Sequence, residues 1–193
     1  MKLSTVVGAR PQFIKAAALS KAICETKKGS NPINEKIIHT GQHFDEKMSH
    51  QFFQELDIPE PSINLGIGGG SHGSNTGRMI IAIEKILISD RPDALLVYGD
   101  TDSTLAGALA ASKLKIPILH IEAGLRSFNR NQPEEQNRVL TDHLSEICFS
   151  PTDIAFDNLK KEGIASHRIV KTGDVMADSA RIFSAKAEAG ISK

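Results

Sequence analysis

Tryptophan, abundant cysteine and long apolar segments are all absent from this sequence of 193 residues. Its longest apolar runs, Ala94–Val97 and Ile116–Ile121, have the length of strands, whereas a membrane-spanning helix needs about 20 residues. Cys24 lies in a helix pattern and Cys148 in a strand pattern, which suggests neither a disulfide framework nor a metal cluster. Met1 leads into a strand pattern with no signal peptide, so we expect a cytoplasmic protein with no membrane partner.

Charge of either sign is not in excess, because 23 basic side chains balance 23 acidic ones. This balance gives no general attraction to nucleic acid, and we expect no nucleic-acid partner. Hydrophobic residues make up 40% of the chain, which is ordinary for a folded protein. The length fits one domain of typical size, about 100–150 residues, with an appendage.

Short β-branched runs alternate with longer amphipathic stretches, which is typical of a parallel sheet with crossover helices. The expected strands are Leu3–Val7, Lys36–His39, Ala94–Tyr98, Pro117–Ile121, Ile147–Phe149 and Arg168–Lys171. The expected helices are Pro11–Glu25, Glu46–Leu56, Asn75–Ile88, Thr101–Leu114, Glu134–Ser145, Asp153–Lys161 and Val175–Ala189. The pattern therefore predicts an α/β fold built on a doubly wound parallel sheet.

Ligands of such sheets bind beyond the carboxyl ends of the strands, so the residues after each strand are the candidate site. The first strand ends in Gly8-Ala9-Arg10-Pro11, and Lys15 follows one helical turn later. Arg10, Lys15 and the amides of the helix start could bind an anion. The alternative is that both cations only solvate the start of the helix.

The second and third strands also end in polar residues. Gln42 and His43 follow the second strand and could bind a sugar hydroxyl or a phosphate, although His43, taken alone, fits a loop or capping residue better than a catalytic one. Asp100 follows directly on a buried strand, where a carboxylate must be paired, cap a helix or act in catalysis. Capping by Asp100 or Thr101 remains an equal alternative.

A second carboxylate, Glu122, ends the neighbouring strand, and two acids at adjacent strand ends are harder to explain by capping alone. Glu134 and Glu135 follow in the first turn of a helix, where they could act in chemistry or simply favour the helix dipole.

One glycine-rich segment matches a dinucleotide-binding pattern at Gly68, Gly70 and Gly73. The pattern requires a buried strand before it and an acidic strand end about 20 residues after it, and neither is present in the sequence. We interpret the segment as a mobile flap. The sequence shows no metal-ligand spacing, P-loop or nucleophile elbow either.

Taken together, the strand-end motifs resemble those of the non-hydrolysing UDP-N-acetylglucosamine 2-epimerases. The motifs in register are Gly8-Ala9-Arg10-Pro11, Lys15, Gly41-Gln42-His43, Gly99-Asp100-Thr101, His120-Ile121-Glu122-Ala123-Gly124-Leu125-Arg126 and Pro133-Glu134-Glu135-Gln136-Asn137-Arg138. Ala9, Gln12-Phe13 and Ser127–Arg130 are closer to the branch that acts on UDP-diacetamido-glucuronic acid. The resemblance implies the Rossmann-like N-terminal half of a glycosyltransferase-B-type fold. We therefore expect such a domain over residues 1–172, and a hinge and the start of a second domain over 173–193.

The resemblance also implies a reaction and a set of residues. Members invert C2 of the sugar without NAD or metal by eliminating UDP and adding it back. Asp100, Glu122 and Glu134 match the catalytic carboxylates, and Arg10 and Lys15 match substrate-binding residues. Matches to a bacterial regulatory site are Gln42, His43 and Glu135.

We expect a UDP-sugar as partner, no cofactor, no metal and a homodimer in the full-length form. Members also have a second domain that holds much of the nucleotide, so we expect this chain alone to be inactive. Two alternatives stay open: a glycosyltransferase-B half-domain, for which the paired acids would be unnecessary, and a stand-alone nucleotide-sugar binding or regulatory module.

Overall fold

The computed structural model describes residues 1–26, 29–42 and 59–191. Within them, seven strands form one sheet in the order β3-β2-β1-β4-β5-β6-β7, and every neighbouring pair is parallel. The strands are β1 (Lys2–Val7), β2 (Asn34–His39), β3 (Ile63–Asn64), β4 (Ala94–Tyr98), β5 (Ile118–Ile121), β6 (Ile147–Ser150) and β7 (Ile169–Lys171). The predicted doubly wound α/β fold is confirmed.

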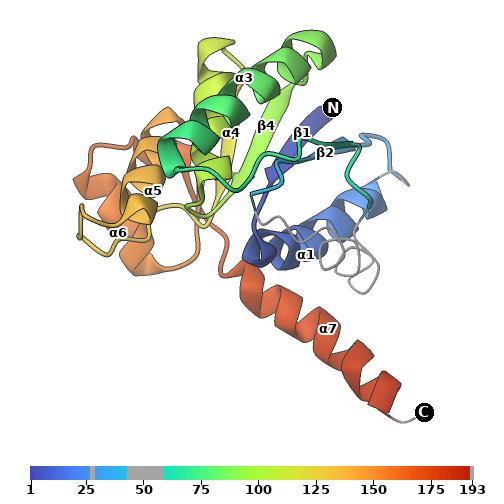
Figure 1. Cartoon of the computed structure of the whole chain (residues 1–193). Helices are drawn as coiled ribbons and strands as arrows, with labels where there is room; N and C mark the ends of the chain where they lie inside the picture. The colour runs from blue at the N-terminus through green and yellow to red at the C-terminus, as the bar shows by residue number, and fades with distance from the viewer. Residues whose placement is uncertain (27–28, 43–58, 192–193) are drawn as a thin grey trace.

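The helices lie on both faces of this sheet (Figure 1). They are α1 (Arg10–Thr26), α3 (His72–Asp90), α4 (Asp102–Lys113), α5 (Pro133–Leu144), α6 (Asp153–Lys161) and α7 (Val175–Ile191). The strand order reverses between β1 and β4, so right-handed crossovers place α1 on one face and α3 and α4 on the other. The helix expected over Glu46–Leu56 lies outside the described residues.

The hydrophobic core has one layer on each face of the sheet, because the central strands are buried on both sides. In β4, Leu95 and Val97 pack into the layer under α3 and α4. The alternate residues Leu96 and Tyr98 pack into the layer under α1, around Phe13. Alternate side chains buried on both faces are typical of central parallel strands. This packing holds the carboxyl ends of the strands at one edge of the sheet.

Helix boundaries differ from the expected ones where a polar side chain caps the helix. α3 begins at His72 instead of Asn75, because the Ser71 hydroxyl accepts a hydrogen bond from the amide of Ser74. α4 begins at Asp102 because the Thr101 hydroxyl accepts from the amide of Thr104 at 3.2 Å. Thr101, not Asp100, is therefore the N-cap.

The last helix, α7, packs against α1 and then extends away from the sheet (Figure 1). The Ser179 hydroxyl, which is buried, donates to the carbonyl of Ile14 at 2.8 Å. The division into residues 1–172 and 173–193 stays a prediction. None of the helices in the described part of the chain is long and apolar enough to cross a membrane.

Candidate active site

The loops that follow β1, β2, β4 and β5 meet at the carboxyl edge of the sheet. The first of them is held by Gln12, which is almost fully buried. Its carbonyl oxygen accepts from the amides of Gly8 and Ala9 at 2.8 and 3.0 Å. Its amide nitrogen donates to the Tyr98 carbonyl at 2.8 Å and to the Thr104 hydroxyl. Gln12 thus fastens the β1–α1 loop to the end of β4.

Lys15 and Glu122 form an ion pair across the end of the sheet. Their side chains are only 11% and 19% exposed, and the pair sits over Gly99, where a β-carbon would lie 3.1 Å from Glu122 Oε2. Glu122 itself has a φ of 70°, in the left-handed region that non-glycine residues seldom adopt. The loop after β5 therefore carries its carboxylate in a strained backbone, next to a partly desolvated ammonium.

Asp100 lies on the adjacent loop and also faces a cation. Its Oδ2 is 2.6 Å from Nη2 of Arg138 on α5, and its side chain is 37% exposed. Asn137 donates to the backbone carbonyl of Asp100 at 2.9 Å and to Oδ1 of Asp102 at 3.1 Å. The loop of Asp100 is therefore held by α5, while its carboxylate stays open to solvent.

Glu134 and Glu135 have different environments although they are neighbours in the first turn of α5. Glu134 is exposed, whereas Glu135 is buried. Glu135 accepts from the amide and hydroxyl of Ser127 at 2.9 and 3.1 Å and from the amide of Phe128 at 3.0 Å. Burial alone would raise the pKa of Glu135, but these hydrogen bonds and the charge of Arg138 hold it below its ordinary value.

Of three further predicted residues, the structure describes Arg10 and Gln42. Arg10 is exposed as the first residue of α1, near the amides of the helix start. Gln42 joins the loop after β2 to the start of α4, because its Oε1 accepts from the amide and hydroxyl of Ser103 at 3.1 and 2.6 Å. His43 lies outside the described residues. The proposed regulatory role of Gln42, His43 and Glu135 stays a prediction.

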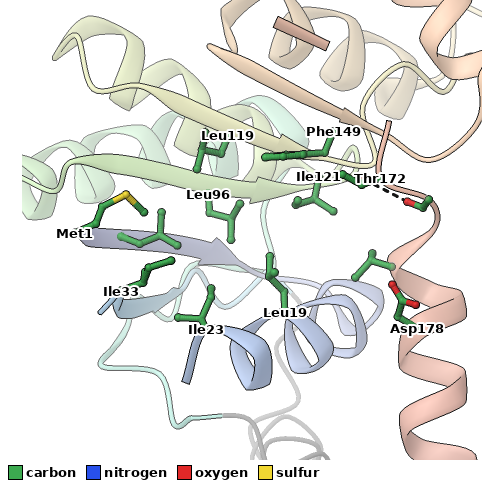
Figure 2. Close-up of a pocket in the computed structure, with 13 residues that line it drawn as sticks. Met1, Leu19, Ile23, Ile33, Leu96, Leu119, Ile121, Phe149, Thr172 and Asp178 are labelled. Atoms are coloured by element: carbon green, nitrogen blue, oxygen red, sulfur yellow. Dashed lines mark hydrogen bonds between the residues drawn. The ribbon is translucent and has the colours of Figure 1, made fainter. Parts of the chain in front are cut away.

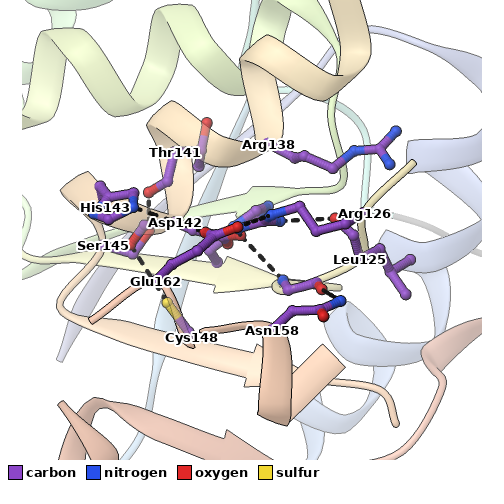
Figure 3. A network of polar contacts seen from close by, with 12 residues as sticks. Leu125, Arg126, Arg138, Thr141, Asp142, His143, Ser145, Cys148, Asn158 and Glu162 are labelled. Carbon is purple, nitrogen blue, oxygen red and sulfur yellow. Dashed lines mark hydrogen bonds and ion pairs between the residues drawn. The ribbon is translucent and has the colours of Figure 1, made fainter. Parts of the chain in front are cut away.

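A buried polar network lies beneath these loops, and the sequence pattern did not identify it as functional (Figure 3). Asp142 on α5 receives hydrogen bonds from His120 and from the Gly124 amide, and it pairs with Arg126, which also binds Glu162. Burial alone would raise the pKa of Asp142, but His120 and Arg126 hold it below its ordinary value. The only sequence signal was that polar residues stand at strand and helix positions that face the core.

A strand precedes the glycine-rich segment, but it is not the buried strand that the dinucleotide-binding pattern requires, because Ile63 is half-buried and Asn64 is exposed. That strand, β3, has only two residues and lies at the edge of the sheet. The segment then contacts α3: Asn75 donates to the Gly70 carbonyl at 3.0 Å and Arg78 to the Gly68 carbonyl at 3.2 Å. The described residues contain no group of three or more His, Cys, Asp or Glu side chains placed to hold a metal ion.

A separate apolar pocket of about 330 Å³ lies on the face of the sheet beside α1 (Figure 2). It is lined mainly by apolar side chains such as Leu19, Leu96, Leu119, Ile121 and Phe149. None of the predicted site residues lines it, and it offers few groups to bind a sugar or a diphosphate. The polar chemistry of the described residues is instead gathered at the carboxyl edge.

Comparisons with known proteins show which family this chain belongs to. A protein-family model described as UDP-N-acetylglucosamine 2-epimerase matches residues 25–193. UDP-2,3-diacetamido-2,3-dideoxy-D-glucuronate 2-epimerase of Pseudomonas aeruginosa is 56% identical over 193 residues, which are 99% of this chain and 53% of that protein. UDP-N-acetylglucosamine 2-epimerase of Methanocaldococcus jannaschii is 51% identical over 179 residues, 93% of this chain and 48% of that protein.

Solved structures give the same result. The crystal structure of the Methanocaldococcus jannaschii UDP-GlcNAc 2-epimerase in complex with UDP-GlcNAc and UDP has a TM-score of 0.92 and 50% identity, covering 97% of this chain and 51% of that one. Acinetobacter baumannii MurG, at 15% identity and a TM-score of 0.60, shares the fold alone. The chain spans about half the length of the curated relatives it matches.

Proposed function

Because this chain belongs to the UDP-N-acetylglucosamine 2-epimerase family, we propose that it forms the acid/base half of a UDP-sugar 2-epimerase. The observation that carries the proposal is the placement of Asp100 and Glu122 at the ends of the adjacent strands β4 and β5. Each carboxylate has a cationic partner, Arg138 for Asp100 and Lys15 for Glu122. Both carboxylates are therefore held in place at the edge of the sheet where a ligand would bind.

The proposed reaction begins with cleavage of the bond between C1 of the sugar and the UDP oxygen, and UDP leaves with the electron pair. The developing positive charge at C1 acidifies the C2 hydrogen, which a carboxylate removes, and a double bond forms between C1 and C2. A second group then returns a proton to the opposite face of C2 as UDP adds back to C1. We assign this proton chemistry to Asp100, Glu122 and Glu134.

Binding is assigned to Arg10 and Lys15, whose cations suit the released diphosphate. The substrate is UDP-N-acetylglucosamine or its diacetamido-glucuronate analogue, since relatives of similar identity are named for each. The resemblance further supports a cytoplasmic homodimer as the full-length form, with a regulatory site at Gln42, His43 and Glu135. No cofactor or metal takes part in the proposed steps.

The first test follows the hydrogen at C2. A chimera in which this chain replaces the matching segment of the Pseudomonas aeruginosa relative is incubated in heavy water with each UDP-sugar. Because the C2 proton is removed and replaced from solvent, the epimeric product should carry deuterium at C2, which NMR detects. A product formed without solvent deuterium would exclude elimination, and an inactive chimera would remove the support for catalysis by this half.

The second test removes single carboxylates in the same chimera. Asp100→Asn and Glu122→Gln should each lower kcat by about 10²–10⁴-fold, the usual contribution of a positioned acid or base. The amides keep the shape of the side chain, and a thermal unfolding curve of each variant shows that a lowered kcat does not come from loss of the fold. Parent-like rates in both variants would contradict the assignment.

A substitution of Glu134 distinguishes a catalytic role from a helix-dipole role. In a helix-dipole role, Glu134→Gln would cost only about 0.3–1 kcal/mol of stability and little activity. Asp153→Asn is the matched control, because Asp153 also lies in the first turn of a helix and its side chain is 84% exposed. A catalytic Glu134 requires a loss of kcat that the control does not show; equal rates in the two variants would remove Glu134 from the site.

A further inference from the structure

Asp142 is a buried carboxylate that receives three hydrogen bonds or ion pairs at once (Figure 3). His120 Nδ1 is 2.6 Å from Oδ1, Arg126 Nη2 is 2.7 Å from Oδ2, and the Gly124 amide donates to Oδ2 at 3.1 Å. Neither Asp142 nor His120 has any exposed side-chain surface. A carboxylate with several donors and a guanidinium is held in its ionised form, which agrees with its lowered pKa.

His120, on β5, has a hydrogen-bond acceptor at each ring nitrogen. Nδ1 faces the Asp142 carboxylate, and Nε2 lies 2.7 Å from the backbone carbonyl of Gly99. An ionised carboxylate and a carbonyl can only accept, and a neutral imidazole can donate from only one nitrogen. The ring makes both hydrogen bonds only if each nitrogen carries a proton.

The charges around His120 balance if its ring is an imidazolium. Arg126 is buried and binds Glu162 through Nε at 2.7 Å and Nη2 at 2.6 Å. Two cations, His120 and Arg126, then face two anions, Asp142 and Glu162. Further titratable groups lie around these four residues. His143 is 3.8 Å from Glu162, Arg168 donates to the carbonyl of Ser145, and burial and the charge of Asp142 raise the pKa of the Cys148 thiol to about 12. A charge-neutral, fully hydrogen-bonded unit is the arrangement in which buried ions are tolerated.

We propose that His120, as an imidazolium, and Asp142 are positioning residues that fix the two carboxylate loops against each other. The carbonyl held by His120 belongs to Gly99, directly before Asp100. The amide held by Asp142 belongs to Gly124, two residues after Glu122. Gly124 packs closely against the backbone of Ala155, because a β-carbon there would lie 2.3 Å from the Ala155 carbonyl oxygen. The catalytic meaning of this unit rests on the proposed function, whereas its protonation state does not.

The protonation state is measured directly on this chain by NMR with ¹⁵N-labelled histidine. At about pH 8 an ordinary histidine is mostly neutral, because its reference pKa is about 6.5. His120 should still show two protonated ring nitrogens, and the exposed His167 gives a second ring spectrum for comparison in the same sample. One unprotonated nitrogen on His120 at that pH would overturn the proposal.

Two variants test the link to the loops. Asp142→Asn should remove one ring proton from His120 and speed hydrogen exchange of the Gly124 amide. Glu162→Gln is the matched control, because it removes an anion from the outer end of the network without touching His120, which should stay doubly protonated. An Asp142→Asn spectrum in which His120 and Gly124 are unchanged would refute the coupling. The measurement on the parent chain decides the protonation state even if Asp142→Asn does not fold.

The effect on catalysis is measured in the chimera described above. Asp142→Asn should lower kcat by about 10²-fold with a much smaller change in KM, because a misplaced acid or base loses rate more than binding. A parent-like kcat in a folded Asp142→Asn chimera would refute a positioning role. An inactive parent chimera would instead count against the proposed function and leave the NMR result on His120 standing.

Discussion

Glu122 combines a proposed chemical role with a backbone conformation that costs stability. Its φ of 70° is one of four positive values among the non-glycine residues that the structure describes. One of the others, Arg91, is a helix C-cap, where the left-handed conformation is common. Glu122 instead follows a strand, where nothing in the helix geometry requires it. For an L-residue this conformation costs about 1–2 kcal/mol, and such strain often marks a functional position.

This strain should reverse the usual order of alanine and glycine. Glycine normally lowers stability by about 0.5–1 kcal/mol relative to alanine, because it has more freedom in the unfolded chain. At position 122 both variants lose the ion pair with Lys15, but only glycine adopts positive φ without strain. Glu122→Gly should therefore equal or exceed Glu122→Ala in unfolding free energy, by up to about 1 kcal/mol, as measured by urea denaturation.

Asp157 supplies the control for this comparison. It is exposed within α6, where the backbone is helical. Here the glycine variant should be the less stable of the two by about 1 kcal/mol. If glycine were also the less stable variant at position 122 by that margin, the backbone of Glu122 would not be strained.

The helices and strands could be predicted well wherever local pattern and packing agree. β4 and α6 have the predicted boundaries, and the other predicted elements that the structure describes differ by a few residues at their ends. β3 was not predicted because it has two residues and follows Pro59 and Pro61, so neither length nor alternation marks it. The first turn of α3 was not predicted because it contains Gly73, a poor helix former, and the Ser71 cap stabilises it.

The grouping of the candidate residues could be predicted as far as strand ends determine it. Asp100 and Glu122 end the adjacent strands β4 and β5, and parallel strands bring their carboxyl ends to one edge, where Lys15 also lies. Their partners could not be predicted, since the contacts of Arg138 with Asp100 and of Lys15 with Glu122 span 38 and 107 residues. Asp142 was missed for the same reason: within a helix, one carboxylate looks like any solvated residue until its contacts across the fold are known.

At the level of the sheet, the polar chemistry and the acid sensitivity of the fold depend on the same loops. Glu135 holds the loop at Ser127 and Phe128, and Asp142 holds the loop at Gly124. Both carboxylates are buried, and both act as ionised acceptors. Protonation would therefore loosen the carboxyl edge before it affects the apolar layers on the two faces of the sheet.

Stability should accordingly fall on acidification, and Glu135 should account for part of the fall. The pKa of Glu135 is lower in the folded state than its ordinary value, so the folded form binds this proton less readily than the unfolded chain. Its contribution is complete above the unfolded pKa, about 4.3, and is lost as the pH falls through the lower, folded pKa. Urea unfolding of the parent chain and of Glu135→Gln over this range is the measurement. The variant should be less stable at neutral pH and lose less stability in acid, since it has no proton to bind at this position. Parallel curves of stability against pH for the two proteins would show that the carboxylate of Glu135 does not contribute in this way.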